Sequence, residues 1–92
     1  ADFCVKYRLI GEVQNVGFRQ YLSSKSGELG VRGWAKNESD GSLVALFCGE
    51  ESAVSEMISH LRPGPIGASV QNMAELLVEE DDMPPPGEFE IR

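Results

Sequence analysis

Residues 11–19, Gly-Glu-Val-Gln-Asn-Val-Gly-Phe-Arg, have the composition of a turn that binds an anion. The segment lies between a stretch of alternating apolar residues and a stretch with helical periodicity, which predicts a strand-to-helix connection. Such a turn leaves main-chain N–H groups unpaired, and together with the positive end of the helix dipole they can hold a negative group. The segment is not a nucleotide P-loop, because no Gly-Lys-Ser/Thr follows, and it is not a dinucleotide fingerprint.

Arg19 adds a fixed cation at the start of the expected helix. A cation in the first turn opposes the helix dipole by about 0.3–1 kcal/mol, so an anion that Arg19 shares with the amides would explain its position. The alternative is a surface arginine whose aliphatic stem covers apolar neighbours. Spacing alone does not choose between these two interpretations.

Length and charge restrict the ligands that such a turn could serve. The chain has 92 residues and a net charge of −7, which predicts one small domain over 1–92. Residues 1–46 carry six bases against five acids, whereas residues 47–92 carry two bases against ten acids. A nucleic-acid partner is not expected, because the acidic half would repel a phosphate backbone. An anionic ligand is therefore expected to bind to the first half.

The sequence offers no sign of a membrane segment. No apolar run approaches the roughly 18 residues that a membrane span needs. The first residues also lack the basic-then-apolar layout of a secretory signal. We therefore expect a cytoplasmic protein without a membrane partner.

Metal ligands are sparse in the sequence. Cys4 and Cys48 cannot form a four-ligand zinc site, and no second histidine joins His60 to complete a catalytic one. The four acids of residues 79–82 are expected to form a solvated turn, because adjacent carboxylates cannot converge without a loop to fold them. No metal site and no cofactor are predicted.

The periodicity of apolar residues predicts the elements that position the turn. Strands are expected over 3–13, 31–37, 43–49 and 68–79, helices over 18–29 and 50–61, and a short strand over 89–92. Gly30 suits a helix end, and Asp40-Gly41 suits a hairpin turn. This order predicts an α+β fold, a ferredoxin-like split βαβ sandwich in which an antiparallel sheet carries two helices on one face, plus a short C-terminal strand.

Antiparallel pairing of the first and third strands would set Cys4 opposite Cys48 on the face of the sheet that we expect to be open. Lys6 would share that open face. Opposed residues have Cβ atoms about 4.5–5.5 Å apart, which could accommodate a disulfide. A reducing cytoplasm would keep the two thiols reduced.

Two motifs together resemble the acylphosphatase family. Residues 11–19 are similar to the family signature G-x-V-Q-G-V-G-F-R, and residues 33–42 are similar to G-W-x-x-N-x-x-D-G-S. Further matches are the segment from Gly64-Pro65 to Ala68 and the tail Phe89-Glu90-Ile91. The resemblance runs along nearly the whole chain without insertions.

The resemblance implies that a small-molecule acyl phosphate, a carboxyl–phosphate mixed anhydride, is hydrolysed without a metal, cofactor or covalent intermediate. Arg19 and Asn37 would be the catalytic residues, with Arg19 on the phosphoryl group and Asn37 positioning the attacking water. A neutral amide suits that second role because it both donates and accepts hydrogen bonds. The phosphoryl group would also bind to the loop amides of Gln14, Asn15, Val16, Gly17 and Phe18. We further expect a monomer.

Asn15 stands where the family signature has a glycine. A glycine there suggests a positive φ, and asparagine is among the few residues with a side chain that tolerate it. The alternative is an ordinary exposed loop residue whose identity matters little.

Two other functions stay open. One is a non-catalytic ferredoxin-like domain that binds an anion for regulation. The other is an acylphosphatase-like module in a larger carbamoyl-transfer machine, which the short chain disfavours. Release of phosphate from benzoyl phosphate would exclude the non-catalytic function.

Overall fold

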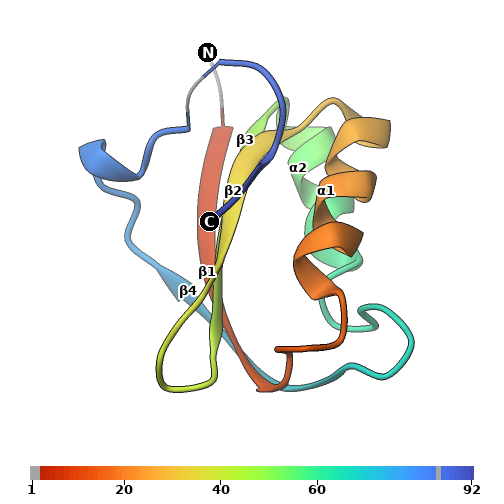
Figure 1. Ribbon diagram of the computed structural model, residues 1–92. Coiled ribbons are helices and arrows are strands. Elements are labelled where there is room, and N and C mark those ends of the chain that lie inside the picture. Colours follow the sequence, from red (N-terminus) through yellow and green to blue (C-terminus); the bar gives the residue numbers. More distant parts are fainter. Residues whose placement is uncertain (1–2, 85) are drawn as a thin grey trace.

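A computed structural model describes residues 3–84 and 86–92, so residues 1, 2 and 85 of the expected domain lie outside the described part. A single sheet carries helices α1 (Phe18–Leu29) and α2 (Glu51–Ser59) on one face (Figure 1). The strands are β1 (Phe3–Glu12), β2 (Arg32–Asn37), β3 (Leu43–Gly49), β4 (Ser69–Leu76) and β5 (Glu90–Ile91), and a 3-10 helix, η1 (Glu80–Asp82), follows β4. The predicted ferredoxin-like α+β fold is confirmed.

The sheet has the strand order β4-β1-β3-β2-β5. Strands β1, β2, β3 and β4 pair antiparallel with their neighbours, whereas β5 runs parallel to β2. The predicted register between β1 and β3 is confirmed, with Cys4 opposite Cys48 and Leu9 opposite Leu43. Strand β3 lies at the centre of the sheet, and every residue from Leu43 to Cys48 is buried.

The main core lies between the helices and the sheet. It is formed by fully buried side chains from α1, α2, β1 and β3, among them Phe18, Leu22, Met57, Leu9 and Phe47. Helix α1 ends as expected at Gly30, which has a φ of 71° and donates its N–H to the main-chain oxygen of Ser26. Among the residues described, no helix is long and apolar enough to cross a membrane.

The opposite face of the sheet is not open, which corrects our expectation. Trp34, Val44, Leu46 and Cys48 form a second buried cluster there, and Val78 packs against it. Strand β4 ends at Leu76 and not at the predicted Glu79, so the next residues are free to fold over this face. Apolar side chains on the second face explain why the chain covers it.

The acidic residues 79–82 are not a uniformly solvated turn either. Asp82 accepts a hydrogen bond from Lys6 Nζ at 2.6 Å, and the two side chains are 17% and 12% exposed. Its main-chain oxygen accepts a second bond from Trp34 Nε1 at 2.7 Å. Burial raises the pKa of Asp82, but the hydrogen bonds from Lys6 and from the Glu79 N–H, with the charges of Lys6 and Arg92, lower it overall.

A disulfide joins Cys4 and Cys48 across β1 and β3. The structure therefore differs from the reduced state that a reducing compartment would favour. The predicted register explains how the bond can form, since it places the two Cα atoms 4.2 Å apart. The two cysteines are separated by 44 positions in the sequence. The bond joins β3 to β1, the strand that precedes the loop before α1.

Candidate active site

Helix α1 begins with main-chain N–H groups that have no partner within the helix. Gly17 is the N-cap, with a φ of 75°. Within the described part of the chain no side chain caps this helix, and its first turn contains no acidic residue. The first helical bond runs from the Tyr21 N–H to the Gly17 oxygen at 3.0 Å. The N–H groups of Phe18, Arg19 and Gln20 therefore remain available, and the helix dipole makes this end positive.

The loop before α1 contains a strained residue at the expected position. Asn15 has a φ of 61°, the one positive φ outside glycine among the residues described. The left-handed conformation that we expected for Asn15 is therefore present, and its side chain is exposed. A side chain at positive φ persists only where the surrounding structure holds it.

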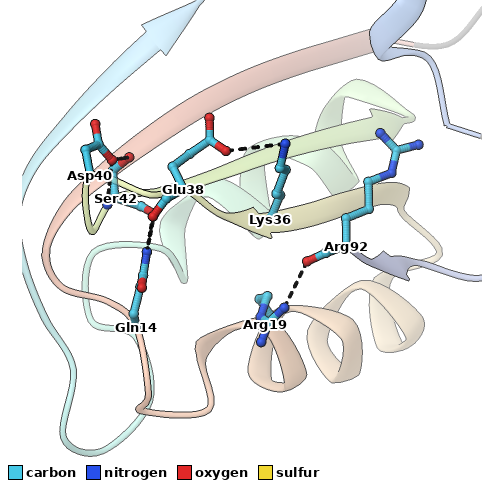
Figure 2. A network of polar contacts seen from close by, with 7 residues as sticks. All are labelled: Gln14, Arg19, Lys36, Glu38, Asp40, Ser42 and Arg92. Atoms are coloured by element: carbon cyan, nitrogen blue, oxygen red, sulfur yellow. Dashed lines mark hydrogen bonds and ion pairs between the residues drawn. The ribbon is translucent and has the colours of Figure 1, made fainter.

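Gln14 is what holds the loop in place. Its Nε2 donates to the main-chain oxygens of Glu38, at 2.7 Å, and Ser42, at 2.9 Å (Figure 2). Both acceptors lie in the turn between β2 and β3. The side chain of Gln14 thus ties the first sequence motif to the second.

The turn between β2 and β3 is fixed by its own side chains. Asp40 Oδ1 accepts from the Ser42 Oγ at 2.6 Å and from the Ser42 N–H at 3.0 Å. The hydrogen bond from the Ser42 side chain is the largest cause of a lowered pKa of Asp40. The D-G-S part of the second motif therefore shapes the turn against which Gln14 is anchored, and it places Asn37 at the end of β2.

Arg19 lies against the C-terminal strand. Its Nη1 donates to the main-chain oxygen of Arg92 at 2.9 Å (Figure 2). Arg92 is itself held, because its N–H donates to the Ala35 oxygen at 2.8 Å and its guanidinium lies 4.7 Å from the centre of the Trp34 ring. One hydrogen bond orients Arg19, and its other N–H groups remain for a ligand.

A pocket of about 400 Å³ lies at this junction of α1, β2 and β5. It is lined by Val13, Asn15, Gly17, Phe18, Arg19, Gln20, Asn37 and Ile91. Of the residues expected at the site, the structure brings together Asn15, Gly17, Phe18, Arg19 and Asn37 around this pocket.

Gln14 and Val16 do not line the pocket. The side chain of Gln14 holds the turn, and Val16 packs against the main core. Sequence reasoning missed Gln20, Ile91 and the main-chain oxygen of Arg92. The tail motif that contains Ile91 could have indicated that residue, but a main-chain acceptor leaves no signal in a sequence.

Asn37 has an unfilled acceptor at the pocket. Its Oδ1 is buried and has no hydrogen-bond partner among the residues described. An unpaired buried acceptor costs roughly 1–3 kcal/mol. The last torsion of asparagine is soft and roughly two-fold, so a half-turn exchanges the oxygen and nitrogen ends of the amide and either end can face a ligand in the pocket.

An uncapped helix end, an arginine and an amide around one pocket of a split βαβ sandwich are groups of the kind that hold an anion in α+β domains. The family model "Acylphosphatase" matches residues 5–91. The chain belongs to the acylphosphatase family, and this membership supports hydrolysis of acyl phosphates.

Individual proteins show the same similarity. An acylphosphatase of Rhizobium etli is 46% identical over 80 residues, which cover 87% of this chain and 85% of that protein. The structure of an acylphosphatase from Coxiella burnetii superposes with a TM-score of 0.82 at 32% identity, covering 99% of this chain and 93% of the other. Full-length HypF, of which this chain covers 12%, shares the fold with a TM-score of 0.78 at 21% identity.

Proposed function

We propose that this chain hydrolyses acyl phosphates by a mechanism in which Arg19 and the first amides of α1 hold the phosphoryl group and Asn37 positions water. The observation that carries the proposal is the meeting of three features at one pocket: unpaired N–H groups, a held guanidinium and an amide with an unfilled acceptor. The N–H groups and the guanidinium belong to α1, and the amide belongs to β2, so the three features come from two separate sequence motifs.

The phosphoryl group would bind where positive charge is concentrated. The N–H groups at the start of α1 point outward from the helix, and Arg19 carries the one full positive charge among the lining residues. Charge-assisted hydrogen bonds to phosphate oxygens are about twice as strong as neutral ones. These donors would also stabilise charge on the phosphoryl oxygens in the transition state without rearranging.

Asn37 would position the nucleophile. A water molecule bound to its Oδ1 donates one hydrogen bond to the amide oxygen and turns a lone pair toward phosphorus. The neutral amide adds no negative charge beside the phosphate, as a carboxylate would. Its place opposite the helix end would set the water against the phosphoryl group that Arg19 holds.

The overall reaction is simple. Water oxygen forms a bond to phosphorus, the bond between phosphorus and the acyl oxygen breaks, and the electron pair leaves with the carboxylate. The products are a carboxylate, inorganic phosphate and one proton. A carboxylate is already a good leaving group, so positioning and charge stabilisation suffice, and the mechanism needs no metal or cofactor.

The experiment is a pair of substitutions assayed with benzoyl phosphate. We expect Arg19→Ala to weaken inhibition by inorganic phosphate and to lower turnover by roughly a hundred- to a thousandfold or more. We expect Asn37→Ala to lose turnover while phosphate still binds. Equal loss of phosphate affinity in both variants would overturn the division of roles, and activity restored only by added metal would overturn the metal-free mechanism.

The same assay tests the non-catalytic alternative, a domain that binds an anion for regulation. Such a domain would bind inorganic phosphate through Arg19 yet release none from benzoyl phosphate. The unfilled acceptor of Asn37 favours the hydrolase, because a binding site alone needs donors for an anion and not an acceptor for water.

A further inference from the structure

We infer that the pocket selects acyl phosphates whose acyl group is apolar and carries no charge of its own, and that Ile91 is the residue that makes this selection. The inference rests on the proposed function and names its substrate class. Two observations carry it: the exposure of the apolar side chains that line the pocket, and the placement of the cations around it.

Ile91 is the apolar surface that a ligand in this pocket would meet. Val13 and Phe18 also line the pocket, but they are 1% and 2% exposed and belong to the main core. Ile91 is 41% exposed, so a ligand in the pocket can reach its side chain. An acyl group packed against Ile91 would remove apolar area from water on both sides of the contact.

The position of Ile91 is fixed by its strand. Strand β5 pairs with β2 so that Ile91 lies beside Ala35, and the next residue, Arg92, accepts the hydrogen bond from Arg19. The side chain is therefore carried by the strand that orients the phosphate-binding arginine. Because Arg19 and Ile91 line the same pocket, a phosphoryl group on Arg19 would place the acyl end of the same small molecule next to Ile91.

The pocket offers charge for one phosphoryl group. Among its lining residues, Arg19 is the one cation. Two further cations, Lys36 and Arg92, are sequence neighbours of lining residues, but each has another partner. Lys36 Nζ lies 3.6 Å from Glu38 Oε2, and the guanidinium of Arg92 lies over the Trp34 ring. Next to Ile91, Glu90 adds a carboxylate that is paired with Arg92. A second phosphate on the acyl group would find no cation at the pocket wall.

The test compares three substrates: benzoyl phosphate, acetyl phosphate and 3-phosphoglyceroyl phosphate. For the wild-type protein we expect kcat/KM to be highest for benzoyl phosphate and lowest for the doubly phosphorylated substrate. In Ile91→Ser we expect kcat/KM for benzoyl phosphate to fall roughly tenfold, because a lost apolar contact is worth about that factor, with less than a threefold change for acetyl phosphate. In Ile91→Lys the preference for 3-phosphoglyceroyl phosphate should rise.

The control is Leu77→Ser, which removes an 83% exposed apolar side chain outside the pocket and should change none of the three values. Equal losses on benzoyl and acetyl phosphate in Ile91→Ser would overturn the inference, because Ile91 would then only hold β5 in place. An unchanged substrate preference in Ile91→Lys would overturn it as well. No hydrolysis of any substrate by the wild-type protein would instead overturn the proposed function itself.

Discussion

The side-chain nitrogen of Gln14 lies 2.9 Å from the main-chain oxygen of Ser42, and this hydrogen bond joins two segments that are separated by the whole of α1 and β2. A second bond from the same nitrogen reaches the Glu38 oxygen at 2.7 Å. The loop before α1 and the turn after β2 therefore form one unit. The placement of Asn37 relative to the helix end depends on that unit.

We expect Gln14→Glu to disturb the pocket without touching a ligand. A carboxylate cannot donate to the two oxygens and would repel them, which should lower the free energy of unfolding by about 1–3 kcal/mol. Inhibition by inorganic phosphate should weaken at the same time. Urea unfolding and phosphate titration measure the two effects. Gln71→Glu, at an exposed position of β4, is the matched control, and equal behaviour of both variants would contradict the role given to Gln14.

We expect the positive φ of Asn15 to decide which residues it can be exchanged for. Asn15→Gly should keep activity close to that of the wild type, because glycine adopts a φ of 61° freely. Asn15→Val forces a β-branched residue into the left-handed region and should cost about 1–3 kcal/mol of stability or distort the helix end. Melting temperature and turnover of the two variants test this. A valine variant equal to the wild type would refute it.

We expect the pair between Lys6 and Asp82 to contribute to stability in a pH-dependent way. Because the pKa of Asp82 is lowered in the folded chain, the contribution is complete above its ordinary value of 3.8 and is lost as the pH falls through the lowered one. Asp82→Asn should therefore destabilise the protein by about 1 kcal/mol at pH 7 and have little effect near pH 2.

Thermal or urea unfolding at both pH values measures this difference. Asp81→Asn changes the charge of the exposed neighbour and serves as the control, with no pH-dependent loss expected. If Asp82→Asn destabilised the protein equally at both pH values, its effect would come from packing and not from the ionised pair.

We expect the disulfide between Cys4 and Cys48 to stabilise the fold without serving the reaction. A bond that closes a segment of this length restricts the unfolded chain by about 4 kcal/mol in the chain-entropy model. Reductant should lower the urea midpoint of the wild type, while turnover below the unfolding range should stay unchanged. The Cys4→Ala/Cys48→Ala double variant should not respond to reductant. A wild-type midpoint that ignores reductant would disprove the stabilising role.

The parts of the fold that follow a repeating pattern could be predicted from the sequence. Alternation along β1 supported the pairing of Cys4 with Cys48, because that register sets the apolar side chains of β1 opposite those of β3 on one face and a shift by one residue would turn them to the other. Gly30 likewise marked the end of α1. At the site, the glycine-containing turn indicated the helix end that lines the pocket.

The rest depended on contacts between distant segments. Nothing in the pattern of residues 68–79 reveals that the strand stops at Leu76, since this depends on the apolar cluster around Trp34 that the next residues cover. The Arg19 contact with the Arg92 oxygen uses a main-chain group, which every residue has. For the same reason the anchoring role of Gln14 was hidden, because both of its acceptors are main-chain oxygens.

Trp34 is the one tryptophan of the chain, so its indole alone supplies the tryptophan fluorescence of the protein. The Arg92 guanidinium lies 4.7 Å from the ring centre, and Nε1 donates to the Asp82 oxygen. The main-chain oxygen of Arg92 also accepts the bond from Arg19, so a negative charge placed on Arg19 reaches the surroundings of the indole through this one residue. The emission spectrum can therefore report occupancy of the pocket directly, without a label and without turnover.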